Sequence, residues 1–249
     1  MQSRATLYNE PILGPNTAAP VSILHNDCIL CAGEDQEEFL AALHAAGMRD
    51  PTTHSSYRGY HFWRFQKCCA ILTGIGTGSL EPALWEILQP GIVKRIILMG
   101  TAGIMPGACV EIGQPYFIGR AWPAGTGIDA LAVDLPLRPR WNIGPAILVA
   151  SSVSTDFYYG FGIKLATGEY PIPTGALHEL FAMHTRQGTQ LVEMEVAQFY
   201  FFCGHFGNDH LQYAAIKAPA NSILDVGKQL SNSRNALTQA VLAAAAMFS

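Results

Sequence analysis

Short apolar runs alternate along the chain with segments whose apolar residues recur at helical spacing. Residues 29–33 predict a buried strand, and the acidic residues at 34–38 suit the first turn of the helix that follows. A strand pair at 60–65 and 69–73 precedes a glycine-rich turn and a helix over 80–88. This alternation of strands with helices predicts an α/β fold.

The second half of the chain continues this pattern. A strand at 95–99 ends in a glycine-containing turn, and a loop-rich stretch covers 122–144. Further strands are predicted at 116–118, 146–150 and 212–218, and further helices at 176–186, 196–206 and 235–248. Residues 1–20, with four Pro or Gly residues, predict an irregular N-terminal arm. No internal repeat or linker-like stretch follows, so we expect a single domain over residues 21–249.

Composition narrows the class of protein. Of 249 residues, 49% are hydrophobic and 14% are charged, which suffices to bury a substantial core. The net charge of -4 and the lack of a basic run exclude a nucleic-acid partner, because no surface is predicted to neutralise phosphates. The sequence shows no signal-like start and no apolar run long enough to span a bilayer, so we expect no membrane association and a cytoplasmic protein.

The six cysteines are predicted to be reduced core thiols, because most of them lie inside apolar runs. Cys28 and Cys31 have the spacing of a metal or redox pair. However, no second pair follows at ligand spacing, and a strand would turn the two side chains away from a common site. We therefore expect no metal.

Three glycine turns follow predicted strands, at Gly33, at 74–79 and at 100–103. In parallel sheets this edge presents backbone N–H groups, and glycine lets a ligand approach the backbone closely. The turns could therefore hold an anion or a sugar edge, although each could also be a simple tight turn. Gly74-x-Gly76-x-Gly78 does not have the spacing of the dinucleotide fingerprint, which argues against a nicotinamide cofactor.

The most informative local segment is Val192-Glu193-Met194-Glu195, at the predicted junction between a strand and an apolar helix. In an extended segment, Glu193 and Glu195 point to the same side. An ionised carboxylate can accept hydrogen bonds from both hydroxyls of a cis-diol. The alternative interpretation is an acidic pair that only favours the start of a helix.

Two more segments could complete such a site. Residues 150–159 leave a strand and enter an aromatic loop, which could stack on a flat base or simply form a packed aromatic cluster. The strand that includes residues 214–218 continues to Asn221, whose amide could contact a base ring or merely cap a turn.

In their order, these segments resemble the nucleoside phosphorylase superfamily, which includes purine nucleoside phosphorylases, uridine phosphorylases and methylthioadenosine nucleosidases. The resemblance covers residues 29–245. It implies a three-layer α/β/α sandwich with a central mixed, partly barrel-like sheet. It also implies cleavage of an N-glycosidic bond through an oxocarbenium-like sugar, without a metal or organic cofactor, in a homo-oligomer such as a dimer or hexamer. The segments that carry it are Ala32-Gly33, Gly74-Ile75-Gly76, Gly100-Thr101-Ala102-Gly103, Ser154-Thr155-Asp156-Phe157-Tyr158-Tyr159, Val192-Glu193-Met194-Glu195 and Asn221.

The resemblance also implies roles for individual residues. Glu195 would bind the ribose hydroxyls, Met194 would pack beneath the sugar, and Tyr158 would stack on the base. Thr101 would lie near the sugar and phosphate. The remaining predicted substrate-binding residues are Gly33, Ala102, Gly103 and Glu193, and the predicted catalytic residues are Glu34, Asn221 and Asp225.

The chain departs from the family at its phosphate site. Phosphorolytic members carry arginines where this chain has Glu37 and Leu98, and those arginines clamp phosphate. We therefore predict a phosphorylase-type pentosyltransferase with an atypical phosphate site, and phosphate is the candidate co-substrate. One alternative is a nucleosidase, in which Glu34, Asp35 or Glu37 positions water. Another is a nucleoside-binding or storage protein that has lost catalysis.

The chain also departs from the family at the residues that would contact the leaving base. Purine-specific members carry a proton-donating Asp where this chain has Asn221, although Asp225 could substitute. Uridine phosphorylases carry Gln and Arg where this chain has Gly162 and Lys164. The choice between a purine nucleoside and uridine therefore stays open.

Overall fold

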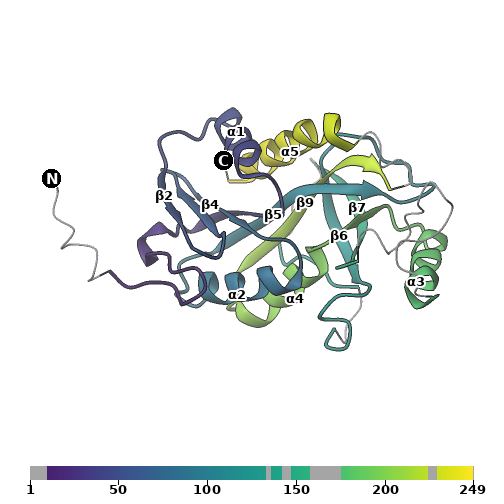
Figure 1. Cartoon of the computed structure of the whole chain (residues 1–249), viewed down its shortest axis with the longest axis horizontal. Coiled ribbons are helices and arrows are strands. Elements are labelled where there is room, and N and C mark those ends of the chain that lie inside the picture. Colours follow the sequence, from purple (N-terminus) through teal and green to yellow (C-terminus); the bar gives the residue numbers. More distant parts are fainter. Residues whose placement is uncertain (1–9, 133–135, 142–146, 158–174, 224–228, 249) are drawn as a thin grey trace.

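The computed structural model describes residues 10–132, 136–141, 147–157, 175–223 and 229–248. Within them, one mixed sheet of nine strands is flanked by helices (Figure 1). The strand order is β2-β3-β4-β1-β5-β8-β7-β6-β9, and β5 also pairs with β9, which closes a five-strand barrel. The predicted α/β class with a partly barrel-like sheet is confirmed. The strands are β1 (Asp27–Ala32), β2 (Thr52–Ser55), β3 (His61–Arg64), β4 (Cys69–Thr73), β5 (Arg95–Ile104), β6 (Tyr116–Pro123), β7 (Leu148–Ser154), β8 (Leu191–Glu193) and β9 (Gln212–Ser222).

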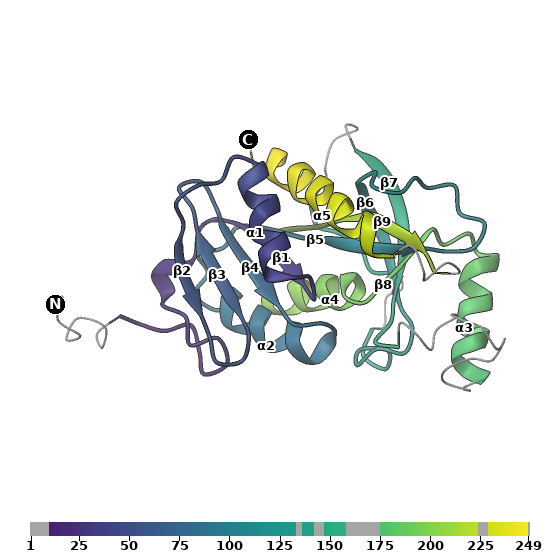
Figure 2. The same ribbon diagram turned by 45° about the horizontal axis from the view of Figure 1, so that its top comes forward.

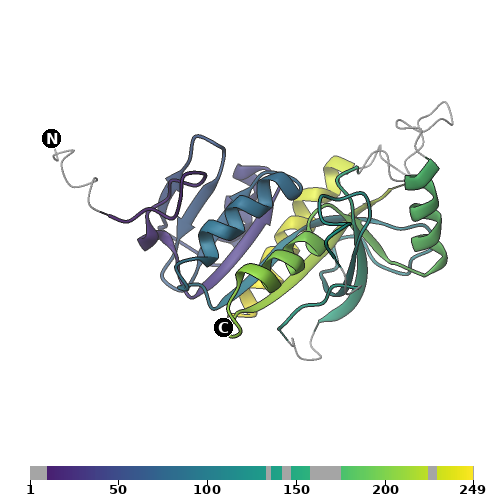
Figure 3. The same cartoon turned by 90° about the horizontal axis from the view of Figure 1, so that it is seen from below.

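The helices lie on both faces of the sheet, which gives three layers. α1 and α5 cover one face and α2 and α4 cover the other (Figure 2). Figure 3, seen from below, shows α2 and α4 side by side on their face. Figure 1 shows α3 apart from the other helices, at the end of the molecule opposite β2. The helices are α1 (Gln36–Ala45), α2 (Thr77–Leu88), α3 (Gly175–Arg186), α4 (Val196–Phe206) and α5 (Gln229–Ala246).

The strand β1 is buried along its whole length. It pairs in parallel with β4 on one side and β5 on the other. Because helices cover both faces of a parallel sheet, its strands are apolar throughout instead of alternating with polar residues. Leu30 and Ile29 accordingly belong to the two opposite core clusters.

The predicted strands and helices are confirmed, and four strands run past their predicted ends: β5, β6, β7 and β9. β5 continues five residues past its predicted end to Ile104, and β9 continues to Ser222, because these two strands pair with each other beyond the apolar run. β2 was not predicted, since Thr52–Ser55 is polar and mostly exposed. None of the described helices is both long and apolar enough to cross a membrane.

The described part of the N-terminal arm, residues 10–20, is held against α2 by a buried carboxylate. Glu86 Oε1 accepts hydrogen bonds from the backbone N–H and side-chain amide of Asn16, at 2.8 and 2.7 Å. Its Oε2 accepts from the backbone N–H and hydroxyl of Thr17, at 2.8 and 2.7 Å. Ile12 and Pro20 form one isolated β-bridge within the arm, and residues 10–20 belong to no named strand.

All six cysteines are free thiols. Five are buried, which confirms that they belong to the core, whereas Cys109 is exposed. The expectation of a core thiol is therefore wrong for Cys109, because it lies in the turn after β5 and not in a strand.

Candidate active site

The barrel brings the predicted site segments to one end. Gly103 of β5 lies in register with Val192 of β8 on one side and with Asn221 of β9 on the other. β7 joins them through the pairing of Ser154 with Glu193. The end of β5, the start of α4 and the end of β9 are therefore neighbours in space, as the predicted site requires.

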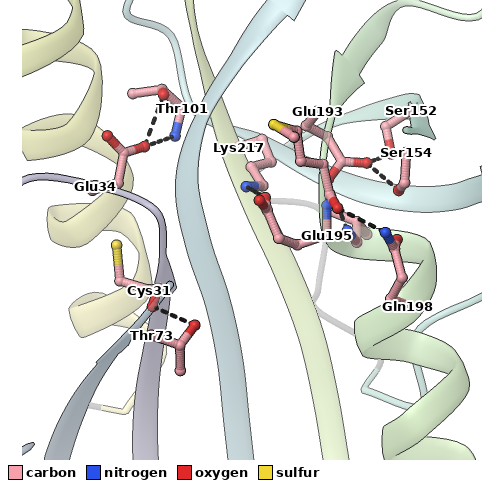
Figure 4. Close-up of polar contacts among 12 residues, drawn as sticks. Cys31, Glu34, Thr73, Thr101, Ser152, Ser154, Glu193, Glu195, Gln198 and Lys217 are labelled. Atoms are coloured by element: carbon pink, nitrogen blue, oxygen red, sulfur yellow. Dashed lines mark hydrogen bonds and ion pairs between the residues drawn. The ribbon is translucent and has the colours of Figure 1, made fainter. Parts of the chain in front are cut away.

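At the centre of this region, Glu195 forms a buried ion pair with Lys217. Lys217 Nζ lies 3.1 Å from Glu195 Oε2 (Figure 4), and the two side chains are 2% and 6% exposed. Glu195 occupies the N-cap position of α4 without a capping bond from its own side chain, and Lys217 lies midway along β9. The predicted sugar-binding carboxylate thus has one oxygen engaged by a cation.

The charges of the two partners depend on each other. Burial raises the pKa of Glu195, Lys217 opposes that effect, and Glu193 adds to it, so the pKa stays above the ordinary glutamate value. Burial by itself would lower the pKa of Lys217, but Glu195, Glu193 and Glu34 together raise it above the ordinary lysine value. The three carboxylates therefore favour the charged form of Lys217.

Glu193 is held by four donors of the chain. Its Oε1 accepts hydrogen bonds from the hydroxyls of Ser152 and Ser154. Its Oε2 accepts from the backbone N–H groups of Glu195 and Val196, at 2.8 and 2.7 Å. Both oxygens are thus occupied, and this carboxylate fixes the first turn of α4 beneath Glu195.

Met194, the predicted floor of the sugar, lies between these two carboxylates and is partly exposed. Gln198 Nε2 donates a hydrogen bond to the Met194 carbonyl at 2.7 Å, one turn into α4. Gln198 is fully buried, and its Oε1 has no hydrogen-bond partner among the described residues. The 193–195 turn is therefore fixed from both its strand side and its helix side.

The C-terminal part of β5, which the sequence predicted as a turn, is bound by a carboxylate of the chain itself. Glu34 Oε1 accepts hydrogen bonds from both the backbone N–H and the hydroxyl of Thr101, each at 2.7 Å (Figure 4). Glu34 and Thr101 are both partly exposed. Thr101, which the resemblance places near the sugar and phosphate, therefore donates both of these hydrogen bonds to a carboxylate of the chain itself.

Gly33 lets the chain turn into this arrangement. It has φ of +72°, and a Cβ on it would lie 2.2 Å from Cγ1 of Ile75. Both the backbone conformation and the lack of space require glycine there. The turn directs Glu34, the next residue, toward Thr101.

The second glycine turn is also closed by a carboxylate. Asp156, from the segment after β7, accepts hydrogen bonds from the hydroxyl of Thr77 at 3.0 Å and from its backbone N–H at 3.3 Å. A Cβ on Gly76, the N-cap of α2, would lie 2.8 Å from Asp156 Oδ1. A helix N-terminus favours an anion, and here the chain supplies it.

The base side of the site is only partly described. Asn221 is buried at the end of β9, and its Nδ2 donates to the carbonyl of Ser222 at 3.0 Å. Phe157 is 45% exposed at the end of the segment after β7. Tyr158 and Asp225 lie outside the described residues.

Among the predicted glycine-turn residues, Ala102 and Gly103 are buried in β5, and their backbone groups continue the pairing with β9. Lys217 was not predicted, because it lies inside a segment whose pattern predicts only a strand. A lysine flanked by Ile216 and Ala218 in a strand expected to be buried could have identified it. Among the residues that the structure describes, no group of three or more His, Cys, Asp or Glu could hold a metal ion.

The barrel-closed sheet with helices on both faces is the nucleoside phosphorylase-like fold. A purine nucleoside phosphorylase from Toxoplasma gondii, solved in complex with immucillin-H, superposes with a TM-score of 0.67 at 16% identity, over 96% of each chain. The P. knowlesi homolog of P. falciparum PNP superposes with a TM-score of 0.68 at 14% identity, over 97% of this chain and 96% of that one. No protein-family model and no curated protein matches the sequence.

Proposed function

We propose that this protein cleaves the N-glycosidic bond of a nucleoside and transfers the sugar to water. The observation that carries the proposal is the pair of hydrogen bonds from Thr101 to Glu34. A phosphate in that place would need those donors and would be repelled by the carboxylate. Asp156 closes the N-terminus of α2 in the same way. Both candidate anion sites therefore favour hydrolysis over the phosphorolysis expected from the sequence.

The sugar would be held by Glu195 and Met194. Lys217 engages Oε2 of Glu195, so Oε1 is the oxygen available to the ribose hydroxyls. The thioether of Met194 would pack beneath the ring. Positive charge that develops on the sugar during bond cleavage would be stabilised by the nearby carboxylates, which are already fixed by the protein.

The attacking water would be held by Glu34. Both Thr101 bonds go to Oε1, which leaves Oε2 to accept a proton from a water molecule as its oxygen attacks the anomeric carbon. The bond from the anomeric carbon to the base breaks, and the base leaves with the bonding electron pair. Asn221 would hydrogen-bond the base without protonating it, so the proton reaches the base from solvent or from another residue.

The proposed hydrolysis is tested by following base release from adenosine, inosine, guanosine and uridine at increasing phosphate concentrations. We expect the rate to be independent of phosphate. The variant Glu34→Gln, which can still accept the Thr101 bonds but is a much weaker base, should lose about a hundredfold or more of the rate. Its control is Glu111→Gln, an exposed change that precedes β6 and that no part of the candidate site involves.

Three results would contradict the proposal. A rate that rises with phosphate would indicate phosphorolysis. An unaltered rate in Glu34→Gln would remove this carboxylate from the chemistry. Nucleoside binding without base release from any of the four substrates would indicate a binding protein on the same fold.

A further inference from the structure

Lys217 is a charged residue in the middle of a buried strand. Only 1% of it is exposed, and its neighbours Ile216 and Ala218 are fully buried. Moving an ammonium group out of water costs far more than moving a neutral polar group, so a buried lysine needs compensating partners. The structure supplies several of them on the side of the candidate site.

The groups that face Lys217 come from four elements or turns. Glu195 lies 3.1 Å away at the start of α4. Glu193 at the end of β8 and Glu34 in the turn after β1 add further negative charge. Cys31 of β1 is a neutral thiol, whose pKa burial raises well above its ordinary value. One carboxylate therefore pairs with the cation, and two more stabilise its charge.

Gly100 provides the space in which these charges approach each other. It lies in register with Lys217 across the β5–β9 pair. A Cβ on Gly100 would lie 3.1 Å from Lys217 Nζ and 3.3 Å from Glu34 Oε1. The ammonium is thus placed between the carboxylate proposed to hold the sugar and the one proposed to hold the water.

We propose that Lys217 is a positioning residue that fixes one oxygen of Glu195 and keeps this carboxylate ionised, so that its other oxygen can accept the sugar hydroxyls. The sugar-binding part of this inference rests on the proposed function. Burial and the neighbouring Glu193 both favour a protonated Glu195, and Lys217 is the group that opposes them. A protonated carboxyl group would lose the charge-assisted pairing with a diol.

Infrared difference spectroscopy on the full chain tests the charge directly. The difference between wild type and Glu195→Gln isolates the bands of the Glu195 carboxyl group, which is then titrated against pH. We expect Lys217→Met to move this titration upward by about one pH unit or more. Lys217→Arg, which keeps the charge, should leave it near the wild-type pH. The same titration pH in Lys217→Met as in wild type would overturn the proposal.

If Lys217→Met does not fold, the double variant Lys217→Met with Glu195→Gln decides the question. Removing both charges should restore the thermal midpoint if Lys217 serves to neutralise Glu195. A double variant as unstable as the single one would assign Lys217 to packing and overturn the proposal.

Calorimetry with immucillin-H, the ligand of the Toxoplasma structure, separates this inference from the proposed function. Immucillin-H affinity should fall below a certain pH. We expect Lys217→Met to raise that pH together with the pH at which Glu195 titrates in the infrared experiment. A shifted titration in a protein whose wild type does not bind immucillin-H would sustain the charge role of Lys217 and count against nucleoside binding. Affinity that is unaffected while the titration shifts would overturn the positioning role.

Discussion

Glu193 and Glu195 are separated by one residue and have different surroundings. Glu193 receives four hydrogen bonds from the chain, from Ser152, Ser154 and two backbone N–H groups. Glu195 has one oxygen engaged by Lys217. The first carboxylate is therefore suited to holding the turn and the second to binding a ligand. The sequence predicted both as substrate-binding residues, because alternation along a strand cannot show which donors each one meets.

The different surroundings lead to a prediction for Glu195→Gln. A glutamine cannot offer two charge-assisted bonds to a diol, so we expect immucillin-H to bind about tenfold more weakly or worse. Isothermal calorimetry measures the change. The control is Glu111→Gln, which is exposed and precedes β6. Equal affinity in Glu195→Gln and wild type would remove this residue from the sugar site.

The carboxylate of Glu193 accepts hydrogen bonds from the backbone at the start of helix α4. The backbone N–H groups of Glu195 and Val196 both donate to Glu193 Oε2, so this side chain takes the place of an N-cap. We expect Glu193→Gln to lower the free energy of unfolding by about 1–3 kcal/mol, because an amide cannot accept all four bonds. Urea unfolding measures this, again against Glu111→Gln. A loss of less than about 0.5 kcal/mol would show that the cap is not important.

The arm and helix α2 are joined through Glu86. Burial would raise the pKa of Glu86, but the hydrogen bonds from Thr17 and Asn16 outweigh burial and hold the pKa below the ordinary value. A lowered pKa in the folded state stabilises the protein above the ordinary glutamate pKa, and this stabilisation is lost as the pH falls through the folded value.

A thermal unfolding series from pH 7 to pH 3 tests this contact. We expect Glu86→Gln to unfold at a lower temperature than wild type at neutral pH and to lose less stability below about pH 4. Glu81→Gln, an exposed change on the same helix, should follow the wild-type curve. Parallel curves for Glu86→Gln and wild type would mean that the carboxylate charge does not hold the arm.

For the whole molecule, local pattern predicted the elements better than their connections. Apolar runs and helical spacing located β1, β4, α2 and α4, because these elements bury continuous or periodic apolar surface. The closure of the barrel came only from the family resemblance. The pairing of β5 with β9 joins residues more than a hundred positions apart, which no local pattern encodes.

The residues of the candidate site were found only in part from the sequence, for the same reason. Glu34, Thr101, Glu193 and Glu195 were identified from turns and motif order, and the structure brings their segments together at one end of the barrel. Lys217 and the bond between Glu34 and Thr101 were missed, because both depend on contacts between distant strands and turns. The bond between Glu34 and Thr101, together with that between Asp156 and Thr77, is what favours water over phosphate in the proposed function.

The central claim is that a nucleoside is cleaved with water even when phosphate is abundant. Its most direct test is mass spectrometry of the sugar product after the wild-type protein has been incubated with adenosine, inosine, guanosine or uridine in excess phosphate. We predict free base together with free pentose from at least one of them. Pentose 1-phosphate as the product, or intact nucleoside in all four reactions, would contradict it.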